Sequence, residues 1–129
     1  MAEPLTIPQA APASPEAALL RLETLTRRAD FLRAARGRKA PVDGFLLQAW
    51  DRGDDGAIRV GFTCSRKVGN AVARNRAKRR LREVARLVLP HHGRAGFDYV
   101  LVGRHEITAR RDFTALQDDL RRALRKVHP

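Results

Sequence analysis

VGFTCSRKVGNAVARNRAKRRLREVARLVL, residues 60–89, is the stretch on which the fold depends. It predicts a short apolar strand, a turn at residues 67–70 and then a long basic helix. Nine Lys and Arg residues lie between residues 66 and 86, against one acid, Glu83. Solvated helix faces usually mix the two signs of charge, so this density indicates a polyanionic partner.

When successive residues of the predicted helix are placed about 100° apart, the positive charge gathers on one side. Four cations repeat at i+4 spacing: Arg74, Lys78, Arg82 and Arg86. Asn75 and Arg79 lie beside them. An apolar stripe marks the opposite, core-facing side: Ala77, Leu81, Val84 and Val88. Like charges at i+4 destabilise a helix by a few tenths of a kcal/mol, and a bound polyanion would relieve that repulsion. The pattern therefore predicts a phosphate-binding surface.

The composition agrees with a basic, single-domain protein. A chain of 129 residues buries about two-thirds of its unfolded surface without disulfides or metals. The formal charge of +12 favours nucleic acid or an anionic membrane surface. We do not expect membrane binding, because the basic helix carries no Trp or Phe to insert. The single cysteine, Cys64, excludes an intramolecular disulfide and a cysteine-rich zinc site, and we expect it to be a buried small hydrophobe.

The N-terminal region differs from the rest of the chain. Residues 1–15 hold four of the seven prolines, so we expect residues 1–18 to be a disordered leader and residues 19–129 to form the domain. The N-terminus does not resemble a secretory signal, and no apolar run reaches the 18 or so residues of a membrane span. We therefore expect a cytoplasmic protein.

Three strands and two further helices are predicted around the basic helix. A helix at residues 27–36 would have Thr26 as N-cap and Gly37 as C′ residue. Strands at residues 44–50 and 57–65 would form an antiparallel hairpin, with Gly61 marking a bulge or a close approach of another backbone. In the first strand, Phe45, Leu47 and Ala49 would face one side and Leu46, Gln48 and Trp50 the other.

The remaining elements follow the basic helix. Residues 90–93 would close it, and their adjacent His91 and His92 are expected in a loop, without a third metal ligand. Residues 96–103 predict a central strand, and residues 113–127 a last helix capped by Asp112 or Thr114. The fold class is α+β, a small mixed sheet packed with helices in the order α-β-β-(β)-α-β-α, the bracketed strand being a short one near residues 39–43.

The run SRKVGNAVARNRAKR, residues 65–79, resembles the signature of the bacterial ribonuclease P protein subunit, whose hallmark is Arg-Asn-Arg at the start of a basic helix. The similarity extends from about residue 22 to residue 127. It implies a left-handed βαβ crossover and the fold of the second domain of ribosomal protein S5. It also implies a protein that assists removal of the 5′ leader from precursor tRNA, with chemistry carried by the RNA subunit and its Mg ions.

The resemblance also assigns partners and residues. The implied partners are the catalytic RNA and precursor tRNA, with no DNA or membrane. The motif assigns RNA contacts to these residues: Arg66, Lys67, Arg74, Asn75, Arg76, Lys78, Arg79, Arg82 and Arg86. Phe31 is implied to line a groove for single-stranded leader. The family often carries two further aromatics where this chain has Ala35 and Gln48, and Trp50 is the candidate substitute.

Three alternatives to this interpretation remain open. A ribosomal protein would share the charge, size and architecture but would sediment with ribosomes. A DNA-binding regulator of the helix-turn-helix kind needs two helices joined by a short turn, whereas a strand precedes this helix. A self-sufficient nuclease needs clustered carboxylates or an acid–base pair, and the acids here are scattered. We therefore expect no catalytic residue, no metal site and no cofactor in the protein itself.

Overall fold

The computed structural model describes residues 22–64, 69–104 and 106–129. Within them the chain forms five strands: β1 (Leu22–Thr24), β2 (Arg38–Pro41), β3 (Phe45–Asp51), β4 (Ile58–Cys64) and β5 (Phe97–Gly103). It also forms four helices: α2 (Arg28–Ala35), α3 (Ala71–His92), α4 (Ile107–Arg110) and α5 (Phe113–Val127). The α+β class and the mixed sheet are confirmed. The predicted leader, residues 1–18, lies outside the described residues.

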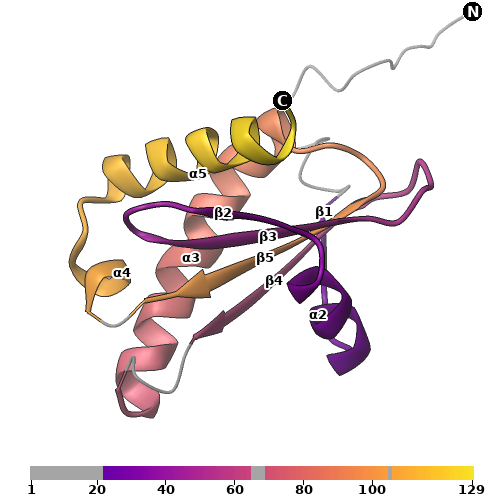
Figure 1. The fold of residues 1–129 in the computed structure, drawn as a ribbon. Helices are drawn as coiled ribbons and strands as arrows, with labels where there is room; N and C mark the ends of the chain where they lie inside the picture. Colours follow the sequence, from indigo (N-terminus) through magenta and orange to yellow (C-terminus); the bar gives the residue numbers. More distant parts are fainter. Residues whose placement is uncertain (1–21, 65–68, 105) are drawn as a thin grey trace, which may run out of the picture.

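The strands form one sheet in the order β1-β4-β5-β3-β2 (Figure 1). The β1, β4 and β5 strands run parallel to one another, and β3 pairs antiparallel with both β5 and β2. β5 is central, as predicted, because six of its seven residues are buried. A strand with both faces covered has a nearly continuous apolar sequence, which residues 97–103 show apart from Asp98.

The predicted hairpin of residues 44–50 and 57–65 is wrong, because β5 lies between β3 and β4. The strand that is apolar on both faces takes the inner position, so the connecting loop must pass the start of β5. The loop is held there by two hydrogen bonds: the Arg52 amide donates to the Gly96 carbonyl, and the Gly96 amide donates to the Gly56 carbonyl. Gly96 has a φ of 81°, and a Cβ there would stand 1.9 Å from the Asp54 carbonyl oxygen. Only glycine fits this crossing.

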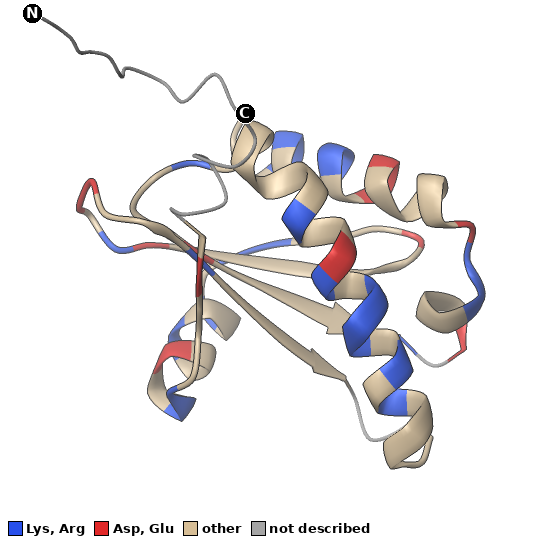
Figure 2. Ribbon diagram, turned by 180° about the vertical axis from the view of Figure 1, so that it is seen from behind, with Lys and Arg blue, Asp and Glu red and all other residues tan. Residues whose placement is uncertain are grey.

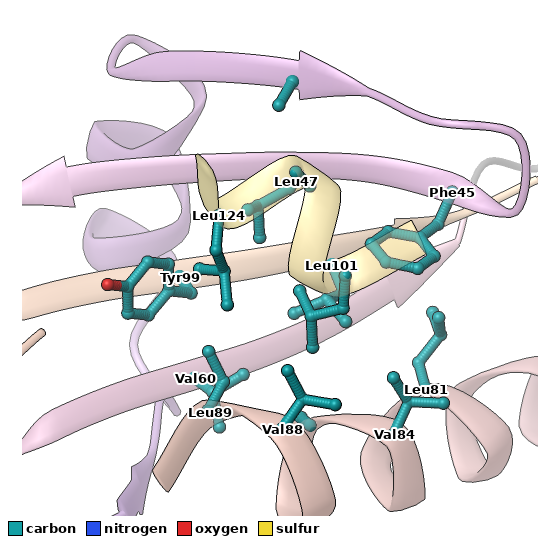
Figure 3. Packing of buried hydrophobic residues seen from close by; sticks show 14 of the residues in the cluster. Phe45, Leu47, Val60, Leu81, Val84, Val88, Leu89, Tyr99, Leu101 and Leu124 are labelled. Atoms are coloured by element: carbon teal, nitrogen blue, oxygen red, sulfur yellow. The ribbon is translucent and has the colours of Figure 1, made fainter. Parts of the chain in front are cut away.

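The main core lies between one face of the sheet and the helices α3 and α5 (Figure 3). The sheet contributes buried side chains that alternate along the strands, including Phe45, Leu47, Tyr99 and Leu101. α3 contributes its predicted apolar stripe, in which Ala77, Leu81, Val84 and Val88 are at most 1% exposed. A smaller cluster of Leu25, Ala34 and Val100 fills the space between the other face and α2. The predicted alternation of residues 45–50 is confirmed.

α3 is the longest element and extends further than predicted. Its N-cap is Asn70, whose side chain accepts a hydrogen bond from the Ala73 amide at 2.9 Å. Its last turn includes Pro90, His91 and His92, so the two histidines lie on the helix and not in a loop. Pro90 is tolerated so near the end because a proline there disturbs only the final turn. Gly93 then terminates the helix by donating its amide to the Leu89 carbonyl.

Some predictions of short elements, helix caps and close contacts are confirmed, and others are wrong. The short strand near residues 39–43 exists as β2, and α5 spans the predicted residues with Asp112, not Thr114, as its cap. Thr26 is not the cap of α2, whose N-cap position is Arg27 without a side-chain hydrogen bond. Gly61 does mark a close approach, although the approaching group is a side chain, the Phe31 ring. β1 and α4 were not predicted, since three or four residues carry too little periodicity.

The C-terminus is fastened to the core through His128. The Tyr99 hydroxyl accepts a hydrogen bond from the Arg94 amide at 2.9 Å and lies within hydrogen-bond distance of His128 Nε2, at 2.7 Å. The edge of the imidazole also packs on Phe97, with ring centroids 4.6 Å apart. Protonation would place a charge on a half-buried ring close to Arg94 and Arg38, so the neutral imidazole suits this site.

Acidification is expected to weaken this C-terminal contact. Burial, followed by the charges of Arg94 and Arg38, lowers the pKa of His128 to about 4 from its ordinary 6.5. The contribution of His128 to stability is therefore complete above its unfolded pKa and is lost as the pH falls through the folded value. Urea unfolding at about pH 7.5 and about pH 5 measures how much the free energy of unfolding falls on acidification. We expect this fall to be smaller in His128→Phe than in the wild type, by on the order of 1 kcal/mol. An equal loss in both proteins would contradict this.

Candidate nucleic-acid interface

The side of α3 that faces away from the sheet carries a row of cations, because the apolar stripe on its other side packs into the core. Figure 2 shows Lys and Arg recurring along the length of this helix. Asn75 and four arginines of the predicted set are exposed there: Arg76, Arg79, Arg82 and Arg86. Lys78 is half-buried beside them. Among the described residues, Arg76, Lys78 and Arg79 form no ion pair, so their charge is available to an external anion.

Three other basic residues of this helix, Arg74, Arg80 and Arg86, have polar partners inside the chain. Arg86 Nη2 lies 2.8 Å from Glu83 Oε2, an exposed i,i+3 pair. Arg74 is half-buried, and its Nη1 donates to the Gly69 carbonyl at 2.8 Å, which closes the turn before the helix. Arg80 donates to the carbonyls of Thr108, Ala109 and Arg111 and thereby ties α4 to α3. Arg80, which the motif did not assign to RNA, is a structural residue.

The remaining assignments on this side, Arg66 and Lys67, lie outside the described residues. The turn that follows them is shaped by Gly69, whose φ of 120° an L side chain rarely adopts. Asn70 then begins the helix by capping it. The Gly-Asn pair of the motif therefore has a local structural reason: it makes the turn from which the basic helix starts.

The three leader-groove candidates lie on the opposite face of the sheet, on the side of α2. Phe31 lies over β4, where a Cβ on Gly61 would stand 2.6 Å from two of its ring carbons. Trp50 and Phe31 are both half-buried and pack against the smaller core cluster. Gln48 lies on this face of β3, in register with Val100 on one side and Lys39 on the other. The structure thus brings Phe31, Gln48 and Trp50 to one face.

A buried carboxylate organises the end of this face. Asp98 is fully buried, and Arg59 bonds both of its oxygens while Arg52 bonds Oδ1 at 2.7 Å. Burial alone would raise the pKa of Asp98, but the hydrogen bonds from Arg59 and Arg52 lower it below its ordinary value. Arg59 also lies 3.6 Å from Asp30 on α2. In the sequence Asp98 is one of several scattered acids. The only sign of its structural role is that a charged residue lies within an otherwise apolar strand.

Cys64, His91, His92 and His128, which the structure describes, add no recognisable reactive centre. Burial raises the pKa of the Cys64 thiol, whose Sγ lies 3.8 Å from the Arg74 carbonyl oxygen. Within residues 22–64, 69–104 and 106–129, no cluster of three or more His, Cys, Asp or Glu side chains is placed to hold a metal ion. None of the described helices is long and apolar enough to cross a membrane.

Comparison with known proteins decides the family. The Ribonuclease P family model matches residues 19–128. The chain belongs to the ribonuclease P protein family. The ribonuclease P protein component of Ruegeria pomeroyi is 62% identical over 109 residues, covering 83% of this chain and 87% of that protein. The protein of the same name from Gluconacetobacter diazotrophicus is 52% identical over 108 residues, covering 83% and 92%.

Solved structures of ribonuclease P proteins share the fold. The Staphylococcus aureus RNase P protein superposes with a TM-score of 0.65 at 27% identity, over 82% of this chain and 97% of that one. The RNase P protein from Thermotoga maritima gives a TM-score of 0.62 at 32% identity, over 76% and 91%. The resemblance carried by residues 65–79 is thereby confirmed. As a ribonuclease P protein, the chain is a component of an endoribonuclease that processes the 5′ end of tRNA.

Proposed function

We propose that this chain is the non-catalytic protein subunit of ribonuclease P and binds the catalytic RNA through the outer face of α3. The observation that carries the proposal is the exposed row Arg76, Arg79 and Arg82, flanked by Lys78, on a helix whose other side is core. Arg76, Lys78 and Arg79 form no ion pair with any described residue. Guanidinium groups bind phosphates in a bidentate manner, and an exposed row at helical spacing suits a phosphate backbone. Asn75 adds an amide that both donates and accepts, as a sugar hydroxyl requires.

The carboxylates of the described chain support a binding role. Hydrolysis of a phosphodiester calls for a free general base, a general acid or clustered metal ligands. The three buried carboxylates, Asp30, Asp98 and Asp119, are each bonded to arginine side chains. We therefore assign bond cleavage to the RNA subunit and its Mg ions, and expect the protein to act in the cytoplasm by lowering repulsion between the two RNAs.

The α2 side of the sheet is the proposed place for the 5′ leader of precursor tRNA. Single-stranded RNA is bound by aromatic side chains that stack on bases next to positive charge. Phe31 and Trp50 supply half-buried rings on this face, and Gln48 pairs in register with Lys39 on β2. This chain has Ala35 and Gln48 where the family often has aromatic residues. Phe31 and Trp50 are therefore the rings on this face that we expect to stack on bases.

Replacing Phe31 is expected to weaken binding of precursor tRNA with its leader by about 5- to 100-fold, the worth of one stacked base. Binding of mature tRNA should not change, because it has no leader. Phe31→Leu is the preferred variant, because leucine removes the aromatic ring but keeps an apolar side chain over Gly61. Phe31→Ala would also remove that packing. The measurement is the affinity of the holoenzyme for both tRNAs, with Leu32→Ala, an exposed neighbour on α2, as control. Equal losses for both tRNAs would return Phe31 to a purely packing role.

A further inference from the structure

A groove runs between the edge strand β1, the adjacent strand β4 and the side of α3. Its volume is about 290 Å³. The floor is apolar and consists of Leu22, Val60, Phe62 and Ala85, and the rim consists of Thr24, Arg82 and Arg86. We call it the β1–α3 groove. It opens on the face of the sheet that packs against α3, and so lies on the opposite side from Phe31 and Trp50.

The groove contains an aromatic ring paired with a guanidinium group. The Arg82 guanidinium carbon lies 5.6 Å from the centre of the half-buried Phe62 ring. Stacking of this kind holds a planar cation over apolar surface and leaves its outward N–H groups free to bond an anion. Arg82 belongs to the same row of cations as Lys78 and Arg79, so the groove continues the proposed RNA-binding face of α3.

Charge around the groove favours an anionic occupant. None of the described residues that line it is acidic. The acid of the edge strand, Glu23, lies between Leu22 and Thr24, and alternation along a strand directs it to the other face of the sheet. Glu83 pairs with Arg86 but does not line the groove. An apolar floor with an aromatic, under a rim of two arginines and one threonine, combines base stacking with phosphate binding.

We propose that the β1–α3 groove receives an unpaired base of the RNA bound along α3. The inference rests on the proposed function and adds to it a second, base-stacking contact on the opposite face of the sheet from the leader. The groove is at the small end of the range for small-molecule sites, which suits one base and not a duplex. The base would lie against Phe62 and Leu22, the Thr24 hydroxyl would face its edge, and Arg82 and Arg86 would meet the flanking phosphates.

Two variants test the groove without removing a cation. Phe62→Leu keeps an apolar side chain but removes the aromatic face, and Thr24→Trp fills the groove from an exposed position on the edge strand. Each should weaken binding of ribonuclease P RNA by about 5- to 100-fold and leave the salt dependence unchanged, because the phosphate contacts remain. Thr114→Trp, at an exposed position on α5, should bind as the wild type does. Thermal unfolding checks that every variant is folded.

The outcomes separate this inference from the function on which it rests. Photo-crosslinking of 4-thiouridine-substituted ribonuclease P RNA should label the peptide that contains Phe62 in the wild type, and Thr24→Trp should abolish the label. If the wild type binds the RNA and both variants bind equally well, the groove inference fails while the proposed function stands. A gain in affinity would also overturn it, since RNA would then be competing with another occupant. If the wild type does not bind the RNA, both proposals fail.

Discussion

Replacing Asp119 by alanine is expected to lower the free energy of unfolding by about 2–4 kcal/mol, because a buried amide and two partly exposed guanidinium groups lose the acceptor that they share. Asp119 is completely buried on α5. Arg111 bonds both of its oxygens, at 2.6 and 3.1 Å, and Arg122 bonds Oδ1. The buried Gly44 amide donates to Oδ2 at 3.1 Å, which fastens the loop between β2 and β3 to α5. Alanine would leave two guanidinium groups and one buried amide without their acceptor.

The neighbouring Asp118 provides a matched control. It has the same side chain on the same helix, but 59% of that side chain is exposed and its one partner is Arg121 at 2.7 Å. Asp118→Ala should therefore cost less than about 1 kcal/mol. Urea unfolding of the two variants and the wild type at neutral pH measures the difference. Similar losses for Asp118→Ala and Asp119→Ala would contradict the structural role assigned to Asp119.

Replacing Arg76 and Arg79 together by alanine is expected to weaken binding of ribonuclease P RNA by roughly 100-fold at low salt. Both side chains are exposed and form no ion pair within the described chain. Each lost phosphate contact should also flatten the dependence of log K on log salt by up to about 0.9 for duplex RNA contacts. The double variant should therefore lose up to about 1.8 from the slope. A filter-binding titration over salt concentration measures both quantities.

The control for this experiment removes the same charge elsewhere. Arg110 on α4 and Arg125 on α5 are both exposed, so replacing them by alanine changes the net charge equally without touching α3. That variant should keep the wild-type slope. An equal flattening in the two double variants would mean that only overall charge matters, and it would remove α3 from the RNA interface.

Periodicity predicted the elements that are long enough to show it. The apolar stripe of α3, the alternation of residues 45–50 and the central position of residues 97–103 all follow from which side chains must be buried. Pairing order does not follow from adjacency in sequence. The chain places β5 between β3 and β4, because a strand that is apolar on both faces is most stable inside the sheet. β1, with three residues, becomes a strand only through its partner β4.

The candidate site could be predicted as a face but not residue by residue. A helical wheel identifies the basic side of α3, yet it cannot distinguish exposed Arg79, which pairs with none of the described acids, from Arg80, whose guanidinium bonds three carbonyls beyond residue 107. Arg74 shows the same limit, since its bond to the Gly69 carbonyl depends on the turn. Buried ion pairs such as Asp98 with Arg52 and Arg59 join distant segments, so only the fold brings them together.

The central claim is that this chain assists an RNA catalyst, and precursor-tRNA cleavage tests it most directly. Bacterial ribonuclease P RNA at low magnesium is incubated with labelled precursor tRNA, with and without the full chain, and the chain is also tested alone. We predict cleavage at the mature 5′ end only when RNA and protein are both present. Tight RNA binding without stimulation would contradict the subunit role and favour a ribosomal or general RNA-binding protein. Cleavage by the chain alone would contradict the assignment of catalysis to the RNA.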